Sequence, residues 1–478
     1  MLDLNKDVIF LILGELKDDK KSIYSCLFIN RNWCETTVPI LWKNPVRTPL
    51  TKKAESKLIN VILLHLSEES RDVLKNQGIN TNIITKTYQR PIFNYINFWK
   101  YLNLHFIERI IFSKNMEKFN VPIIRNEILK LFINRNTRII SLYFPQNFDY
   151  QLHHIPGVEY CFSELESFHC NGFIDQNILE GLSKICKSIK KLVFDKYYCT
   201  NNSSGIVKLI EAQKSLNNVS FIYHYAGINE SFSKSLEESL IKHADTIQYL
   251  RICWKPITRI LSYLVNLLSF EIIISKSSWK NHSENLSLPI LKFLKAHKVS
   301  SKILANLIEN TKGHLSEISI YFYGIDSIDN KRLIKAIYKN CQNLRYLHLL
   351  LVNDNINSLV STEFENILIN CQFLSGLVIE TISDYNNVFR WDKLFEMLTE
   401  SSPISLFRFK FFSYEIIELE CLKLFFDNWK NRNPILLEID GDYITEEIQQ
   451  LEKYKAKGII KKYFIGFRGN AYNDFEWI

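Results

Sequence analysis

The chain has 478 residues, of which 46% are apolar and 13% aromatic, so it can bury a large core and does not belong to the disordered class. Its net charge of +8 is scattered, with no long basic block, which argues against nucleic acid as a partner. No apolar run approaches the roughly 18 residues of a membrane-spanning helix, so we expect no membrane partner and an intracellular protein. Ten cysteines in this length predict reduced thiols rather than a disulfide framework.

The first 45 residues carry apolar side chains at the spacing of short helices. The first stripe consists of Leu4, Val8, Ile12 and Leu16, with Ile9 and Leu13 beside it. A second set, after a polar break, consists of Ile23, Cys26, Leu27, Trp33, Leu41 and Trp42. Asn5 is expected to cap the first helix, with Asp7 as a favourable anion in its first turn. Because three short helices bury little surface, we expect Val8, Ile12 and Leu13 to stay uncovered for a second polypeptide.

The spacing of these residues resembles that of the F-box family. The family has Leu-Pro where Leu4-Asn5 stands and Glu where Asp7 stands, and neither departure removes an apolar contact. The resemblance implies a three-helix bundle that binds the Skp adaptor and, through it, a cullin-RING ubiquitin ligase. The side chains that it assigns to adaptor binding are Leu4, Val8, Ile9, Ile12, Leu13, Leu16, Ile23, Leu27, Leu41 and Trp42. The alternative is that these residues only form a core, which is the favoured reading for Trp33 and Leu27.

An L-x-x-L-x-L frame recurs along most of the remaining chain. The frames are Ile139/Leu142/Phe144, Leu165/Phe168/Cys170, Ile189/Leu192/Phe194, Leu216/Val219/Phe221, Ile247/Leu250/Ile252, Leu267/Phe270/Ile272, Leu288/Leu291/Phe293, Leu315/Ile318/Ile320, Leu344/Leu347/Leu349, Leu374/Leu377/Ile379, Ile404/Phe407/Phe409 and Pro434/Leu437/Ile439, with Ile460/Tyr463/Ile465 as a final strand and Ile107/Ile110/Phe112 as a weak first one. The last two positions of a frame lie on one face of a strand, and helical patterns separate the frames. Each unit is therefore predicted to be strand, turn and helix, stabilised by stacking on its neighbours.

The predicted fold class is α/β, with parallel strands on a concave face and helices on a convex face. The pattern resembles the leucine-rich repeat family, in its class of long units. The predicted organisation is an F-box at 1–45, a linker and helical cap at 46–105, leucine-rich repeats at 106–445, and a capping helix and strand at 446–478. Three cysteines precede their frames by three residues and are expected to fill a tight buried place: Cys186, Cys341 and Cys371.

Residues that could carry chemistry are few. No nucleophile elbow, phosphate-binding loop, dinucleotide fingerprint or zinc-helix motif is present, so we predict no catalytic residues and no cofactor. One cluster contains possible metal ligands, namely His153, His154, Cys161, His169 and Cys170. It lacks a Cys-x-x-Cys knuckle, and His169 and Cys170 are neighbours on a predicted strand and point to opposite faces, so we predict no metal site. The pair Glu237-Glu238 is interpreted as a solvated helix face.

On each strand, the position between the two buried frame residues is expected to face the concave side. These candidate substrate-binding residues are Tyr143, Arg251, Ser319, His348, Val378, Arg408 and Glu438. For any one of them, simple solvated sheet surface is the favoured alternative. Their mixed chemistry does not identify the substrate.

The leading hypothesis is a non-catalytic substrate-recognition subunit of an SCF-type ubiquitin ligase, working in the cytoplasm, the nucleus or both. Its partners would be the Skp adaptor, the cullin-RING ligase behind it, and an unknown protein substrate. A second hypothesis is an interaction scaffold without ligase attachment, in which the first 45 residues only cap the repeats. A third is an enzyme with an unfamiliar site, which would need a deep pocket with convergent polar groups.

Overall fold

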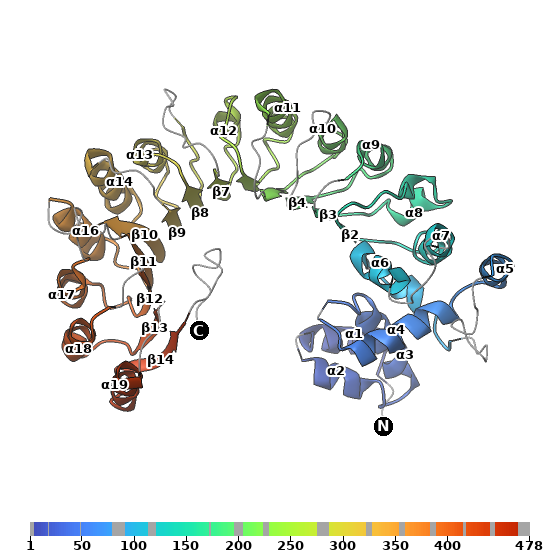
Figure 1. The fold of residues 1–478 in the computed structure, drawn as a ribbon, viewed down its shortest axis with the longest axis horizontal. Helices are drawn as coiled ribbons and strands as arrows, with labels where there is room; N and C mark the ends of the chain where they lie inside the picture. Colours follow the sequence, from blue (N-terminus) through green and yellow to red (C-terminus); the bar gives the residue numbers. More distant parts are fainter. Residues whose placement is uncertain are drawn as a thin grey trace. The chain divides into compact units, whose positions relative to one another are not determined.

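The computed structural model describes residues 4–17, 19–47, 49–78, 91–112, 121–171, 174–195, 204–222, 229–274, 286–321, 327–352, 359–382, 389–413, 417–439 and 445–466. The chain forms two compact units, residues 1–217 with 221–223 and residues 218–220 with 224–478. Both are built from alternating strands and helices (Figure 1). Within the described ranges, no helix is long and apolar enough to cross a membrane.

The first unit begins with three short helices. They are α1 (Lys6–Glu15), α2 (Lys20–Cys26) and α3 (Arg31–Trp42). Asn5 caps α1 by accepting a hydrogen bond from the amide of Asp7 at 3.2 Å, as expected. Asn30 caps α3 in the same way, through the amide of Trp33 at 3.0 Å. The core of this bundle consists of Ile9, Leu13 and Cys26, with Leu16, Trp33 and Ile40 packed against it.

The rest of the first unit continues directly from this bundle. Its helices are α4 (Lys52–Leu64), α5 (Glu68–Asn76), η2 (Tyr95–Phe98), α6 (Leu104–Phe112), α7 (Val121–Phe132), η4 (Leu152–His154), α8 (Val158–Cys161), α9 (Gln176–Ile185) and α10 (Ser204–Glu211). Its strands are β1 (Tyr101–Asn103), β2 (Ser141–Phe144), β3 (Ser167–Asn171) and β4 (Lys191–Asp195), and the pairs β1–β2, β2–β3 and β3–β4 are parallel. The phenylalanines of successive strands pack together, with ring centroids of Phe144 and Phe168 5.3 Å apart. These ring contacts hold successive strand–helix repeats of the first unit in register.

The second unit repeats the same arrangement with longer strands. Its strands are β5 (Asn218–Ile222, shared with the first unit), β6 (Tyr249–Ile252), β7 (Ser269–Ile273), β8 (Phe293–His297), β9 (Glu317–Tyr321), β10 (Tyr346–Val352), β11 (Gly376–Ile382), β12 (Arg408–Ser413), β13 (Ile435–Ile439) and β14 (Ile460–Ile465). Its helices are α11 (Glu230–Ile241), α12 (Ile260–Tyr263), α13 (Ser301–Glu309), α14 (Ser327–Asn340), α16 (Leu359–Asn370), α17 (Trp391–Ser401), α18 (Leu419–Asn428) and α19 (Thr445–Ala456). From β5 to β14, each strand pairs in parallel with the next one along the chain.

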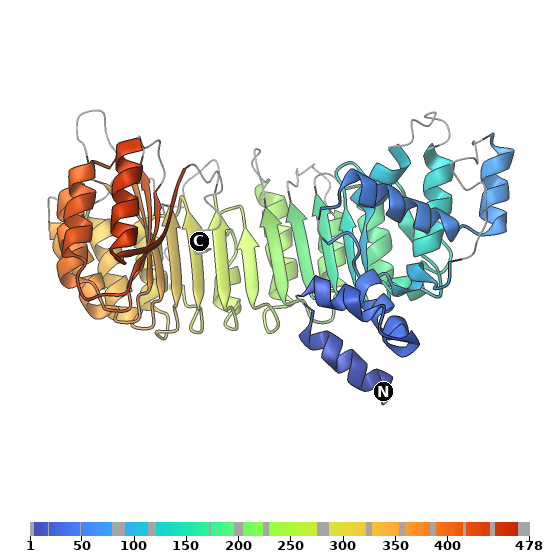
Figure 2. The ribbon, with the colours of Figure 1, turned by 90° about the horizontal axis from the view of Figure 1, so that it is seen from below.

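The strands of the second unit line the inner side of a curved stack, and the helices lie on its outer side (Figure 1). Figure 2 shows the strands lying side by side across this stack. The frame residues point toward the helices and are buried, as Ile318, Leu347 and Leu377 show. The α/β class with a parallel sheet of stacked strand–helix units is thereby confirmed.

Three frames predicted from the sequence are wrong. Residues 107–112 lie in helix α6, and the first strand is β1. The true frame there is Trp99/Leu102/Leu104, three buried residues whose first position is a tryptophan. In β8 the core residues are Leu294 and Ala296, so Phe293 lies on the opposite face. In β12 they are Phe409 and Phe411, two residues later than predicted, and Ile404 is 72% exposed.

The three frame cysteines occupy the expected buried places. Cys186, Cys341 and Cys371 are completely buried, and burial raises the pKa of Cys186 and Cys371 to about 12. At the far end, α19 is followed by Gly458, whose φ of 76° lies in the left-handed region that favours glycine. Strand β14 then pairs with β13, as predicted for a terminal strand.

Glu237 is not on a solvated face, which corrects the prediction for this residue. Its side chain is completely buried, and its carboxylate accepts hydrogen bonds from the indole of Trp254 at 2.8 Å and from the amide of Thr258 at 2.6 Å. The carboxylate thus fastens the loop after β6 to helix α11. Glu238 beside it is exposed, 3.9 Å from Lys234.

Candidate interaction surfaces

The first two helices carry a large exposed apolar surface. Its side chains are Leu4, Val8, Phe10, Leu11, Ile12, Tyr24, Phe28 and Ile29, each more than a third exposed. Phe28 is 87% exposed and Leu11 69% exposed. The cause is local, because residues 8–13 of α1 are all apolar and only one side of a helix can face the bundle core. We call these eight residues the α1–α2 surface.

The ten side chains assigned to adaptor binding by the F-box resemblance divide into three groups. Leu4, Val8 and Ile12 belong to the α1–α2 surface. Ile9, Leu13 and Ile23 are buried in the bundle, Leu16 packs against its core, and Leu27, Leu41 and Trp42 are partly buried. The expectation of an uncovered side chain therefore holds for Val8 and Ile12 but is wrong for Leu13. Periodicity missed Phe10, Leu11 and Phe28, although the unbroken apolar run of α1 signalled the first two.

A three-residue ion cluster holds α1 against α3. The carboxylate of Glu35 accepts a hydrogen bond from the ammonium of Lys6 at 2.7 Å and from the guanidinium of Arg31 at 2.7 Å. These two contacts lower the pKa of Glu35 to about 2. The Lys6–Glu35 pair thus links the start of α1 to α3 at the surface, while the Arg31–Glu35 pair lies within α3.

Trp42 connects the bundle to the segment that follows it. Its ring stacks on Tyr95 with centroids 4.2 Å apart and meets Trp99 edge-on at 6.4 Å. The amide of Lys100, next to β1, donates a hydrogen bond to the carbonyl of Lys43 at 2.9 Å. The end of α3 is therefore packed against the start of the strand–helix stack.

The inner face of the second unit carries two rows of residues in register across the strands. The first ladder consists of Tyr249, Ser269, Phe293, Glu317, Tyr346, Gly376 and Arg408. The second ladder consists of Arg251, Glu271, Lys295, Ser319, His348, Val378, Lys410 and Glu438. Five of the seven predicted concave residues lie in the second ladder. Arg408 lies in the first, and Tyr143 lies in the first unit, where its ring meets His169 at 4.6 Å.

The far half of the second ladder is buried rather than solvated. Ser319, His348, Val378, Lys410 and Glu438 are each at most 5% exposed. The ammonium of Lys410 lies 3.4 Å from the carboxylate of Glu438, and Nδ1 of His348 lies 3.4 Å from the hydroxyl of Ser319. Sequence reasoning missed Lys410 because the β12 frame was placed two residues early. These residues hold strands together, so the partly exposed first ladder is the better candidate for contact with a partner.

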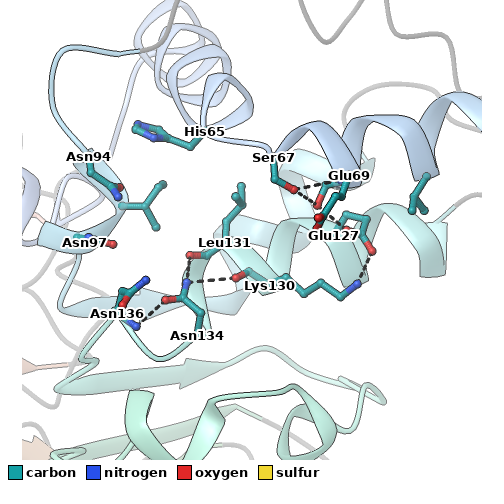
Figure 3. A pocket seen from close by; sticks show the side chains of 13 residues that line it. His65, Ser67, Glu69, Asn94, Asn97, Glu127, Lys130, Leu131, Asn134 and Asn136 are labelled. Atoms are coloured by element: carbon teal, nitrogen blue, oxygen red, sulfur yellow. Dashed lines mark hydrogen bonds and ion pairs between the residues drawn. The ribbon is translucent and has the colours of Figure 1, made fainter.

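The first unit also contains a polar pocket of about 490 Å³ between α5, α7 and the segment before η2 (Figure 3). Glu127 on its wall accepts hydrogen bonds from the hydroxyl of Ser70 at 2.6 Å and from the ammonium of Lys130 at 2.7 Å. Burial raises the pKa of Glu127, but these hydrogen bonds outweigh it and leave the pKa below its ordinary value. His65 lines the same pocket, and burial lowers its pKa. The Glu127 carboxylate is held by its neighbours and braces α5 against α7.

No group of three or more potential metal ligands lies together in the part of the chain that the structure describes. Cys170 is completely buried while His169 beside it is partly exposed, so the two side chains do point to opposite faces of β3. No protein-family model matches the chain, and no curated protein matches it.

Proposed function

We propose that the chain is the substrate-recognition subunit of an SCF-type ubiquitin ligase. Residues 1–45 would act as an F-box that binds the Skp adaptor, and the strand–helix units would act as leucine-rich repeats that bind a protein substrate. The protein would catalyse no step itself. It would raise the local concentration of the substrate beside the transfer machinery of the ligase.

The observation that carries the proposal is the α1–α2 surface. Large apolar side chains lie exposed in this short stretch of the chain, with Phe10 and Leu11 on α1 and Phe28 just after α2. Several large exposed apolar side chains within 26 residues of the chain indicate an interaction site. Recognition would follow the helix-in-groove mode, in which a few desolvated apolar anchors supply most of the affinity.

The test is co-purification of the full chain with a Skp adaptor. Ile12→Asp places a charge on the α1–α2 surface and should weaken binding by at least tenfold, because an interface cannot bury an unpaired carboxylate cheaply. Ile404→Asp is the matched control, since Ile404 is equally apolar and 72% exposed on the second unit. The proposal fails if the wild-type chain ignores the adaptor, or if Ile12→Asp binds as well as Ile404→Asp.

The second candidate function is a scaffold in which the bundle only caps the repeats. The stacking of Trp42 on Tyr95 favours it, because removing the bundle would expose that ring. Deletion of residues 1–45 therefore cannot separate the two functions, since both predict damage at this joint. Leu11→Asp separates them more cleanly than Ile12→Asp, because Leu11 is 69% exposed and a pure cap loses little when it changes, whereas Ile12 is 37% exposed.

A further inference from the structure

Glu317, in the first ladder of the second unit, is a carboxylate without a counter-ion in the described part of the chain. Its neighbours in register are Phe293 on β8 and Tyr346 on β10, so an aromatic residue flanks it on both neighbouring strands, whose backbones lie about 4.8 Å away. Its backbone amide is used in the sheet, through the carbonyl of Lys292 at 3.1 Å. Its side chain makes no hydrogen bond or ion pair with any described residue.

Two cations of the inner-face ladders, Lys295 on β8 and Arg408 on β12, are engaged elsewhere. The ammonium of Lys295 lies 5.3 Å from the ring centre of Tyr321, and the guanidinium of Arg408 donates a hydrogen bond to the hydroxyl of Tyr346 at 2.5 Å. Gly376, between Tyr346 and Arg408 in register, leaves the room that this contact across two strands needs. The side of Tyr346 that faces β12 therefore already holds a cation, whereas the side that faces β9 adjoins a carboxylate that lacks one.

A carboxylate in this position costs stability until it is paired. Burial raises the pKa of Glu317, which shows that its charged form has lost part of its hydration. An ammonium or guanidinium would restore the lost stabilisation through an ion pair, and the rings of Phe293 and Tyr346 would add cation–π attraction. A second anion or an apolar group would bring no such gain.

We propose that Glu317, between Phe293 and Tyr346, is the contact point for a lysine or arginine side chain of the protein that the second unit binds. This inference rests on the proposed function, because it names the class of substrate. The site lies on an open sheet face rather than in a closed cavity, so the basic side chain would come from an extended segment laid across the strands. We call the three residues the cation cradle.

The test is selection of random twelve-residue peptides on the full chain, without adaptor present. Wild-type protein should enrich peptides that contain lysine or arginine, and Glu317→Gln should lose this enrichment. A synthetic peptide of the selected sequence should bind Glu317→Gln about tenfold more weakly than wild type. Glu238→Gln is the matched control on the outer helix α11, and it should keep the enrichment.

Charge reversal supplies the decisive arm. Glu317→Lys should bind the same peptide once its basic residue is replaced by glutamate, and should reject the original peptide. Absence of basic enrichment on the wild-type chain, or equal binding by Glu317→Gln and wild type, overturns the cation cradle. The result does not depend on the adaptor, so failure of the adaptor assay with intact peptide selection would sink the ligase assignment and leave the cradle standing.

Discussion

Replacement of Glu237 by glutamine, a side chain of nearly the same size and shape, should strongly lower the stability of the second unit around this residue. Each carboxylate oxygen of Glu237 faces only donors: the indole of Trp254 and the amide of Ile257 at 3.0 Å on one side, and the amide and hydroxyl of Thr258 on the other. The NH₂ of glutamine would replace one of these two acceptors; even on the Thr258 side, where the hydroxyl can turn to accept from it, the backbone amide of Thr258 would lose its acceptor. Each buried donor left without an acceptor costs about 1–3 kcal/mol, so we expect the local free energy of unfolding to fall by about 2–4 kcal/mol.

Native-state hydrogen exchange is the appropriate assay, because stacked repeats need not unfold in one step. A local loss of about 2–4 kcal/mol should speed exchange at the amides of Ile257 and Thr258 by roughly 30- to 1,000-fold. Glu238→Gln, one residue away and exposed, should change these rates by less than about threefold. If Glu237→Gln exchanges at the rate of the control, the carboxylate is not the fastener of this loop.

Two further predictions follow from the pKa shifts. The pKa of Glu35 is lowered from 4.5 to about 2, so its contacts with Lys6 and Arg31 stabilise the bundle fully above pH 4.5, and this stabilisation is lost as the pH falls toward 2. The thermal unfolding temperatures of wild type and Glu35→Gln should therefore differ at pH 7 and converge near pH 2. A difference that does not depend on pH would contradict the ion cluster. Burial raises the pKa of Cys186 and Cys371 to about 12, so these thiols should not react with an aromatic disulfide reagent at pH 8 until the chain is unfolded in urea. In the native chain the reagent should instead label the partly exposed Cys34 and Cys253. Peptide mass spectrometry identifies the labelled cysteines.

Most of the sheet could be predicted from the spacing of apolar residues, and the error at β8 has a clear physical cause. Where apolar and polar residues alternate strictly, as in Leu250, Arg251 and Ile252, only one assignment of the strand's two faces buries the apolar residues. Around β8 the sequence offers Leu291, Phe293 and Leu294, and a shift of one residue exchanges the two faces of the strand. Side-chain chemistry alone does not choose between these two assignments; the pairing of neighbouring strands does.

The candidate surfaces were only partly predictable for a different reason. Periodicity assigns a residue to a face but does not give its accessibility, so His348 and Glu438 were placed on the correct face and turned out to be buried. Lys410 was missed because its strand frame was misplaced, and Glu317 because it precedes the first buried strand residue. A polar side chain at such a position gives no signal until the register sets Phe293 and Tyr346 on either side of it.

The free energy available from burying the α1–α2 surface determines how much of it a partner must cover. Complete burial of one large apolar side chain is worth about 1.5–3 kcal/mol, and most of this is still available at Phe28 and Leu11, which are 87% and 69% exposed. Micromolar binding requires about 8 kcal/mol after the cost of association has been met. Phe28 and Leu11 together supply about 2–5 kcal/mol and all eight residues about 7–13 kcal/mol before that cost, so a partner must cover nearly the whole surface and add contacts beside it. The exposed residues on both α1 and α2 must therefore act together, and a partner that contacts α1 alone would bind too weakly to persist.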